Sequence, residues 1–172
     1  MNENRMDVFD YQNITVDEKF CPQYMDGYEK FGWKIDENLQ LEKNMGKITL
    51  HMKRNRHIVN KVELIRLQKH YEACMEEIRT LEDSKNSVPA MVSLTCGLCG
   101  CGFMAGSVFA VTAETPIIWL TVILAIPGFL LWGAAYFLYK RVRTWRTKKI
   151  EPVIEAKYDE MYEVCKKAYG LL

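Results

Sequence analysis

Two long uncharged runs constrain the fold of this chain more than any other feature. Residues 88–113 and residues 115–139 contain no Asp, Glu, Lys or Arg, and only Glu114 lies between the two runs. Each run exceeds the roughly 20 apolar residues that a helix needs to cross a hydrocarbon core. A buried core helix would account for one such run, but two adjacent runs in 172 residues favour a membrane pair. We therefore expect transmembrane helices at 88–113 and 115–139, joined by a very short turn.

The distribution of basic residues predicts how this pair is oriented. A basic juxtamembrane stretch, residues 140–151, follows the second run, whereas the short connection at Glu114 has no Lys or Arg. Segments rich in Lys and Arg stay in the cytoplasm, so we expect both termini of this cell-membrane protein to be cytoplasmic. Six cysteines in a reducing compartment or in lipid are not expected to form disulfides. The residues that set the topology and meet lipid headgroups are Lys140, Arg141, Arg143, Arg146, Lys148 and Lys149.

The segments on either side of the two runs have the apolar spacing of packed helices. In residues 57–86 and in residues 152–172, apolar positions recur at alternating steps of three and four, which is typical of a coiled-coil seam. Because a short turn makes the membrane helices antiparallel neighbours, we expect these extensions to form a cytoplasmic antiparallel coiled coil. We also expect kinks or restarts at Pro89 and Pro152. The predicted seam consists of Leu64, Leu67, Tyr71, Cys74, Ile78, Leu81, Ile154, Met161, Val164 and Ala168.

The aromatic-rich segment 1–56 shows strand periodicity instead. Phe31, Trp33 and Ile35 alternate with polar residues, and "GKITLHMKR" at residues 46–54 alternates in the same way. Two such stretches around a turn predict a β-hairpin at about residues 31–53. The upstream aromatic side chains, Phe9, Tyr11, Phe20, Tyr24 and Tyr28, are expected to cover its apolar face.

The expected fold is thus a mainly α membrane protein. It consists of a two-span transmembrane helical hairpin, extended into a cytoplasmic antiparallel coiled coil, with a small N-terminal cap that contains a β-hairpin. The segment order is 1–56, 57–86, 88–113, 115–139, 140–151 and 152–172.

The stretch "LTCGLCGCGFMAG", residues 94–106, combines a CxxC motif with a ridge of small residues. Cys96 and Cys99 lie on one side of a helix, but Cys101 points elsewhere, and neither uncharged run contains a His, Asp or Glu to complete a metal site. Small side chains spaced by four let membrane helices approach closely. We therefore interpret the stretch as a helix-packing interface made by Cys96, Gly100, Gly102, Gly106 and Ala110.

Motifs that carry chemistry are otherwise scarce. No Gly-rich phosphate loop, HExxH or GxSxG is present. We expect no enzyme activity, no cofactor and no nucleic-acid partner. His70 and Cys74, at i and i+4 on one helix face, are a weak metal candidate, as are Cys96 and Cys99.

The function that these patterns favour is a small integral membrane scaffold or accessory protein. It would form a homo-oligomer through the Gly/Cys face and present its cytoplasmic stalk to an unidentified membrane or cytoplasmic partner. One alternative is a small oligomeric channel or transporter lined by the first membrane helix, with Ser93, Thr95 and Ser107 as a polar lining. A second alternative is a thiol redox or metal-binding membrane protein.

Overall fold

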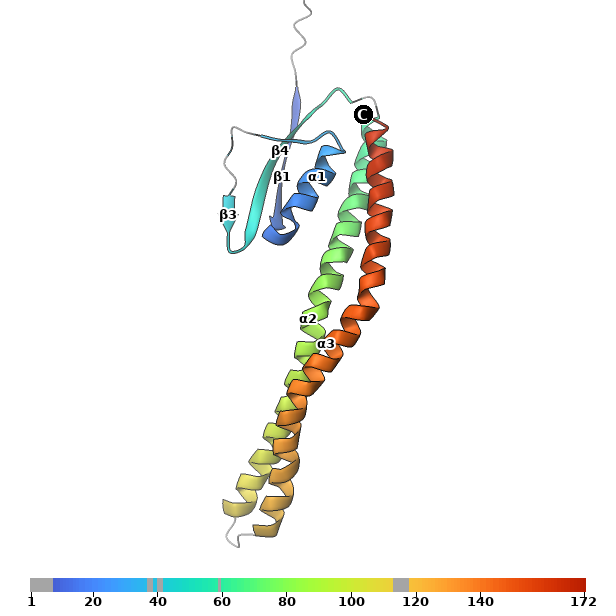
Figure 1. Ribbon diagram of the computed structural model, residues 1–172. Helices are drawn as coiled ribbons and strands as arrows, with labels where there is room; N and C mark the ends of the chain where they lie inside the picture. Colours follow the sequence, from blue (N-terminus) through green and yellow to red (C-terminus); the bar gives the residue numbers. More distant parts are fainter. Residues whose placement is uncertain (1–7, 37–38, 40–41, 59, 113–117) are drawn as a thin grey trace, which may run out of the picture. The chain divides into compact units, whose positions relative to one another are not determined.

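The computed structural model describes residues 8–36, 39, 42–58, 60–112 and 118–172. The element order is β1 (Phe9–Asp17), a short 3-10 turn (Glu18–Phe20), α1 (Cys21–Glu29), β2 (Lys34–Ile35), β3 (Glu42–Asn44), β4 (Lys47–Asn55), α2 (Lys61–Thr112) and α3 (Ile118–Tyr169) (Figure 1). The protein is mainly helical, and its two long apolar helices pack against each other as a helical hairpin. These features confirm the expected helical hairpin and the N-terminal sheet.

The chain divides into two compact units that we treat separately. The first unit, the head, comprises Met1–Glu76 and Lys157–Leu172. The second unit, the hairpin unit, comprises Glu77–Ala156 and contains the apolar halves of α2 and α3. The long helices therefore contribute to both units.

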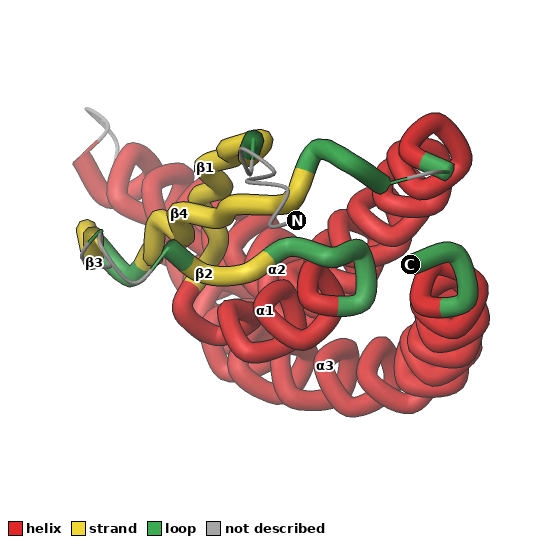
Figure 2. Tube along the Cα trace, turned by 90° about the horizontal axis from the view of Figure 1, so that it is seen from above, coloured by secondary structure: helices red, strands yellow, loops and turns green. Residues whose placement is uncertain are grey.

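The sheet of the head is built around β4. Strand β1 runs antiparallel along one edge of β4, from the pair Phe9–Asn55 to the pair Asp17–Lys47. On the other edge, β2 and β3 both pair antiparallel with β4 (Figure 2). The predicted antiparallel pairing is found for Lys34 and Ile35 with Lys53 and Met52. The strand β3, which pairs with the first residues of β4, lies in the segment that the sequence pattern predicts to be the turn.

The connection between β3 and β4 is a two-residue turn with an unusual backbone. Met45 and Gly46 both have positive φ angles, 47° and 77°. Two-residue hairpin turns of this kind match the right-handed twist of the strands that they join, and they favour glycine because it has no Cβ. The turn thereby fixes the register in which Asn44 lies opposite Lys47.

The alternation of β1 contradicts one expectation about the upstream aromatic side chains. Phe9 and Tyr11 lie on the exposed face of β1, and Tyr11 is 67% exposed. The inward positions of this strand carry Gln12 and Val16 among others, because a strand reverses its face at every residue. Phe20 and Tyr28, which follow the strand, are buried as expected.

The core of the head lies among the sheet, α1 and the two long helices. Leu50 and Met52 of β4 are buried, together with Phe31 and Trp33. Seam positions on α2 and α3 are buried with them, which agrees with the periodicity of these segments. The buried members of the seam in the head are Leu64, Leu67, Tyr71, Cys74, Val164 and Ala168.

Met75 and Gln68 extend the buried surface of α2 beyond this narrow seam. Met75 is fully buried, and Gln68 accepts a hydrogen bond from the Trp33 indole at 2.9 Å. Gln68 also donates to Gln12 of β1 at 3.3 Å. A helix covered on two sides buries a wider stripe than a helix with one partner, and here the sheet and α1 supply the second side.

Charged side chains attach the sheet to the start of α2. Lys61 forms an ion pair with Asp10 of β1, and this hydrogen bond holds the pKa of the Asp10 carboxyl below its usual value. The guanidinium of Arg54 lies 4.3 Å from the ring centre of Trp33, and its Nη2 is 3.9 Å from Asp10 Oδ2. Burial lowers the pKa of Arg54, whereas the Asp10 charge opposes that shift.

Both long helices continue through their prolines. Pro89 lies inside α2, and Pro127 and Pro152 lie inside α3. Of the predicted kinks or restarts at Pro89 and Pro152, the restarts are wrong, because Lys61–Thr112 and Ile118–Tyr169 are each one helix. A proline removes a single N–H donor from the helix, and Pro89 is fully buried, so packing around it supports the continuous helix. The predicted turn at Glu114 lies outside the described residues.

Candidate functional site

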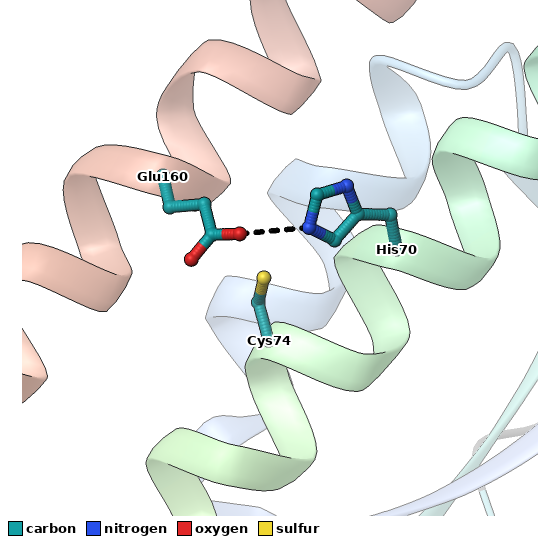
Figure 3. A group of neighbouring side chains, drawn as sticks. All are labelled: His70, Cys74 and Glu160. Atoms are coloured by element: carbon teal, nitrogen blue, oxygen red, sulfur yellow. Dashed lines mark hydrogen bonds and ion pairs between the residues drawn. The ribbon is translucent and has the colours of Figure 1, made fainter.

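The head brings together three side chains that can act as metal ligands. His70 and Cys74 come from successive turns of α2, and Glu160 comes from α3 (Figure 3). Residues four apart lie on the same face of a helix, and α3 runs along that face. The Nε2 atom of His70 is 2.8 Å from Oε1 of Glu160, and the ligand atoms of all three residues lie within 4.8 Å of one another.

The electrostatics of this cluster keep its carboxylate charged. Lys157, one turn before Glu160, donates to Oε2 at 2.9 Å. The hydrogen bonds from Lys157 and from His70 lower the pKa of Glu160 below its usual value. Cys74 is buried, with 2% of its surface exposed, whereas the side chains of His70 and Glu160 are about half exposed. The cluster therefore has a thiol at its floor and two polar ligands at its rim.

A cavity of about 630 Å³ lies beside this cluster, between α1 and the end of α3. Its walls are mainly apolar and aromatic, and Asp26, Lys30, Asp159 and Lys166 supply charges around them. Cys165 is in the wall, and burial raises the pKa of its thiol above the usual value. The remaining residues of the wall are Gln23, Gly27, Tyr71, Tyr158, Met161, Tyr162 and Tyr169.

Tyr71 forms the floor of the cavity and is fixed in place. Its hydroxyl donates to the backbone carbonyl of Gln23 at 2.8 Å, and its ring is 5.5 Å from that of Phe31 and 6.1 Å from that of Tyr28. The Tyr28 hydroxyl donates to Glu72 at 2.6 Å. Burial raises the pKa of both tyrosines above the usual value. Tyr71 lies in the cavity wall, and Tyr28 packs behind it.

The predicted helix-packing residues separate into two groups in the hairpin unit. An ideal Cβ on Gly100 would lie 2.6 Å from the Trp132 ring, and one on Gly106 would lie 2.7 Å from Leu124. The Cys96 thiol donates to the Leu131 carbonyl at 3.5 Å. These three residues therefore pack against α3 of the same chain. A Cβ on Gly102 would meet no atom within 4 Å, and Ala110 is half-buried.

Hydroxyl groups of the first apolar run are occupied by backbone carbonyls. Ser107 donates to Thr121 of α3 at 3.0 Å. Ser93 and Thr95 donate to carbonyls one turn earlier in α2, at 3.0 and 2.9 Å. Such bonds satisfy hydroxyl donors locally. The hydroxyl hydrogens of these side chains are therefore already used and are not available to donate to a molecule in a pore.

The CxxC motif, the basic stretch at residues 140–151 and the remaining seam residues all lie in the hairpin unit. In the CxxC motif, Cys96 turns toward α3 whereas Cys99 is exposed, and among the described residues the only three-ligand cluster is the one in the head. In the basic stretch, Lys140, Arg141, Arg143, Lys148 and Lys149 are exposed and Arg146 is half-buried. Lys149 lies over the Trp145 ring at 5.2 Å. The seam residues of the hairpin unit, Ile78 and Ile154, are buried, and Leu81 is half-buried.

Comparison with known proteins gives no further guide to these sites. No protein-family model, no curated protein and no solved structure matches this chain.

Sequence reasoning missed Glu160 and most of the cavity wall. Glu160 is 90 residues from His70, and only the antiparallel packing of α2 and α3 brings the two together. The register of the two helices, counted from Glu114, is the signal that places Glu160 near His70. The cavity also depends on α1, for which the sequence pattern gives no clear periodicity.

Proposed function

We propose that the protein is a small, non-enzymatic integral membrane protein whose hairpin unit anchors a binding head to the bilayer. The supporting observation is the exposure of the apolar segments. The most apolar windows of α2 and α3 have mean hydropathies of 1.8 and 2.0, yet only 17% and 6% of their residues are buried. A core helix of a water-soluble protein would be mostly buried. Lipid is the solvent in which exposed apolar surface carries no cost.

The exposed side chains of the hairpin unit support this placement. Large apolar residues point outward along the described parts of both apolar segments, and their contact with water would cost roughly 25 cal/mol for each Å² of exposed surface. The basic residues at the start of 140–151 argue for a cytoplasmic head. Examples of exposed residues are Leu94, Leu98, Val108, Phe109, Trp119, Ile126, Leu130, Tyr136 and Phe137.

The homo-oligomer that we propose rests on the small residues that face away from the hairpin. Gly102 and Gly133 are exposed and have open space where a Cβ would lie. Glycines on a lipid-facing surface allow a second helix to approach closely. Gly100 and Gly106 already contact α3 of the same chain. The outward glycines are therefore the ones that we propose contact a second copy.

The head is the part that we propose meets a partner protein. Its cavity has Tyr162 and Tyr169 in the wall, each 66% exposed, beside charges of both signs. Tyrosines around an apolar hollow are typical of protein interfaces, where they combine a large contact area with a hydrogen-bonding group.

A photo-crosslinking amino acid at Tyr162 tests the binding head in living cells. We expect irradiation to join position 162 to one defined protein, identified by mass spectrometry. The matched control is Tyr11, which is equally exposed but lies on the outer face of β1. The proposal fails if position 162 gives no adduct, or if positions 162 and 11 give the same adducts.

A further inference from the structure

We propose that His70, Cys74 and Glu160 bind one Zn²⁺ ion that joins α2 to α3 within the head. The three side chains supply an imidazole nitrogen, a thiolate sulfur and a carboxylate oxygen, which are the donor types found at zinc sites. The proposal is independent of the membrane anchor, because every ligand belongs to the head.

The spacing of the donor atoms fits a tetrahedral ion after small side-chain adjustments. With Zn–N and Zn–O distances near 2.1 Å and Zn–S near 2.3 Å, tetrahedral ligands lie about 3.3 to 3.6 Å apart. The donor atoms here span from 2.8 Å, between His70 and Glu160, to at most 4.8 Å. The ion would replace the hydrogen bond between imidazole and carboxylate, and the thiol would move toward it.

The surroundings orient one of the ligands, Glu160, for the metal. Both carboxylate oxygens of Glu160 accept hydrogen bonds, from Lys157 and from His70. Lys157 occupies Oε2 of Glu160 and leaves Oε1 facing His70. A ligating carboxylate is commonly oriented in this way by a hydrogen bond to its second oxygen. The positive charge of Lys157 opposes the binding of a cation, so the thiolate must supply much of the affinity.

A groove that is open to solvent reaches His70 and Glu160. It leaves room for a fourth ligand of the ion. The groove has a volume of about 740 Å³ and is bordered by His70 and Glu160, by the acidic residues Glu63 and Glu163, and by the basic residues Arg66, Lys166 and Lys167. The ion can enter by this path and keep one water molecule as its fourth ligand, which is the arrangement of a three-ligand zinc site. Two of the ligands belong to α2 and the third belongs to α3, so the ion would cross-link the two helices.

The proposal is tested with the purified full chain, stripped of metal with a chelator and kept reduced. We expect one equivalent of Zn²⁺ to bind in a chelator-competition titration. Co²⁺ should give the absorption bands of a tetrahedral ion with a thiolate-to-metal charge-transfer band. His70→Ala and Glu160→Gln should each weaken Zn²⁺ binding by at least about tenfold. Losses of this size occur even when only a residue that hydrogen-bonds to a ligand is removed.

Control variants separate this site from the other thiols and imidazoles. Cys99→Ser and His57→Ala should bind Zn²⁺ as the natural chain does. Cys74→Ser should remove the charge-transfer band; because Cys74 is buried, circular dichroism must confirm that this variant folds. His70 and Glu160 are about half exposed, so their variants should fold and test the site even if Cys74→Ser does not fold. The proposal is overturned if the natural chain binds no Zn²⁺, or if binding survives both His70→Ala and Glu160→Gln.

Discussion

Replacing Gly27 with alanine should open the head, with a loss of about 3 kcal/mol in its free energy of unfolding. The added Cβ would lie 2.1 Å from the Tyr71 hydroxyl oxygen and 2.2 Å from the ring carbon that carries it. Distances this short require one partner to move. Tyr71 cannot move easily, because its hydroxyl is bonded to the Gln23 carbonyl and its ring is enclosed by other aromatic rings.

Labelling of the Cys74 thiol measures this loss directly. Cys74 is buried, so a maleimide reaches it only when the head opens. In the presence of a metal chelator, Gly27→Ala should be labelled at Cys74 about a hundredfold faster, since each 1.4 kcal/mol changes an equilibrium tenfold. Gly170→Ala is the control, because a Cβ there meets its nearest atom at 3.5 Å.

A double-mutant cycle identifies Tyr71 as the cause. In a Tyr71→Ala background the clash is absent, and Gly27→Ala should then change the labelling rate little. The interaction energy between the two positions should therefore be close to the full cost of the single change. Equal effects of Gly27→Ala in both backgrounds would show that the tight contact with Tyr71 does not exist.

Replacing Gly100 with leucine should separate α2 from α3 in the hairpin unit. Gly100 and Gly128 face each other, and a Cβ on Gly100 would lie 3.1 Å from the Gly128 carbonyl oxygen as well as 2.6 Å from the Trp132 ring. A whole leucine side chain cannot fit between backbones this close. Gly102→Leu is the matched control, because position 102 faces open space.

A disulfide between the helices reports this separation. The Cys96 sulfur lies 3.5 Å from the Leu131 carbonyl oxygen, so a Leu131→Cys variant should cross-link to Cys96 under mild oxidation. Adding Gly100→Leu should slow that reaction by about tenfold or more, as expected for a cost of at least 1.4 kcal/mol. Adding Gly102→Leu should leave the rate unchanged. Mass spectrometry of chymotryptic peptides measures the cross-link, and equal rates for the two leucine variants would contradict the packing.

The helical hairpin follows from the sequence because its signals are long and regular. Uncharged runs of this length predict the apolar halves of α2 and α3, and the three–four spacing by itself identifies Leu64, Tyr71 and Ala168 as buried positions. Period-two alternation around Trp33 and Leu50 likewise reveals the paired strands. In each case the pattern repeats over many residues, so one exception does not obscure it.

The parts that the sequence does not reveal depend on long-range packing. The strand β1 alternates in polarity, but its inward face carries Asp10 and Gln12, which are satisfied by Lys61 and Gln68 of α2. The first half of β1 therefore alternates with its apolar side chains, Phe9 and Tyr11, facing outward, so the pattern by itself indicates the wrong buried face. The cluster at Glu160 has the same origin, because no local pattern links residue 160 to residue 70.

The contacts of the glycines in residues 94–110 also could not be predicted from the sequence. Spacing alone places Gly102 with Gly106 and Ala110 on one ridge. The crossing of the two helices instead brings Gly100 and Gly106 to α3 and leaves Gly102 facing outward. Which glycines meet a partner depends on where the helices cross, and sequence spacing does not contain that information.

The topology of the full chain tests the membrane anchor most directly. Alkaline phosphatase, which is active only outside the cytoplasm, is fused after residue 114 of a truncated chain, and a fluorescent protein that matures in the cytoplasm is fused after Leu172. If α2 and α3 each cross the bilayer, both reporters will be active, and the fluorescent protein will remain in carbonate-washed membranes. An inactive phosphatase at residue 114, or a fluorescent protein recovered in the soluble fraction, would contradict the account.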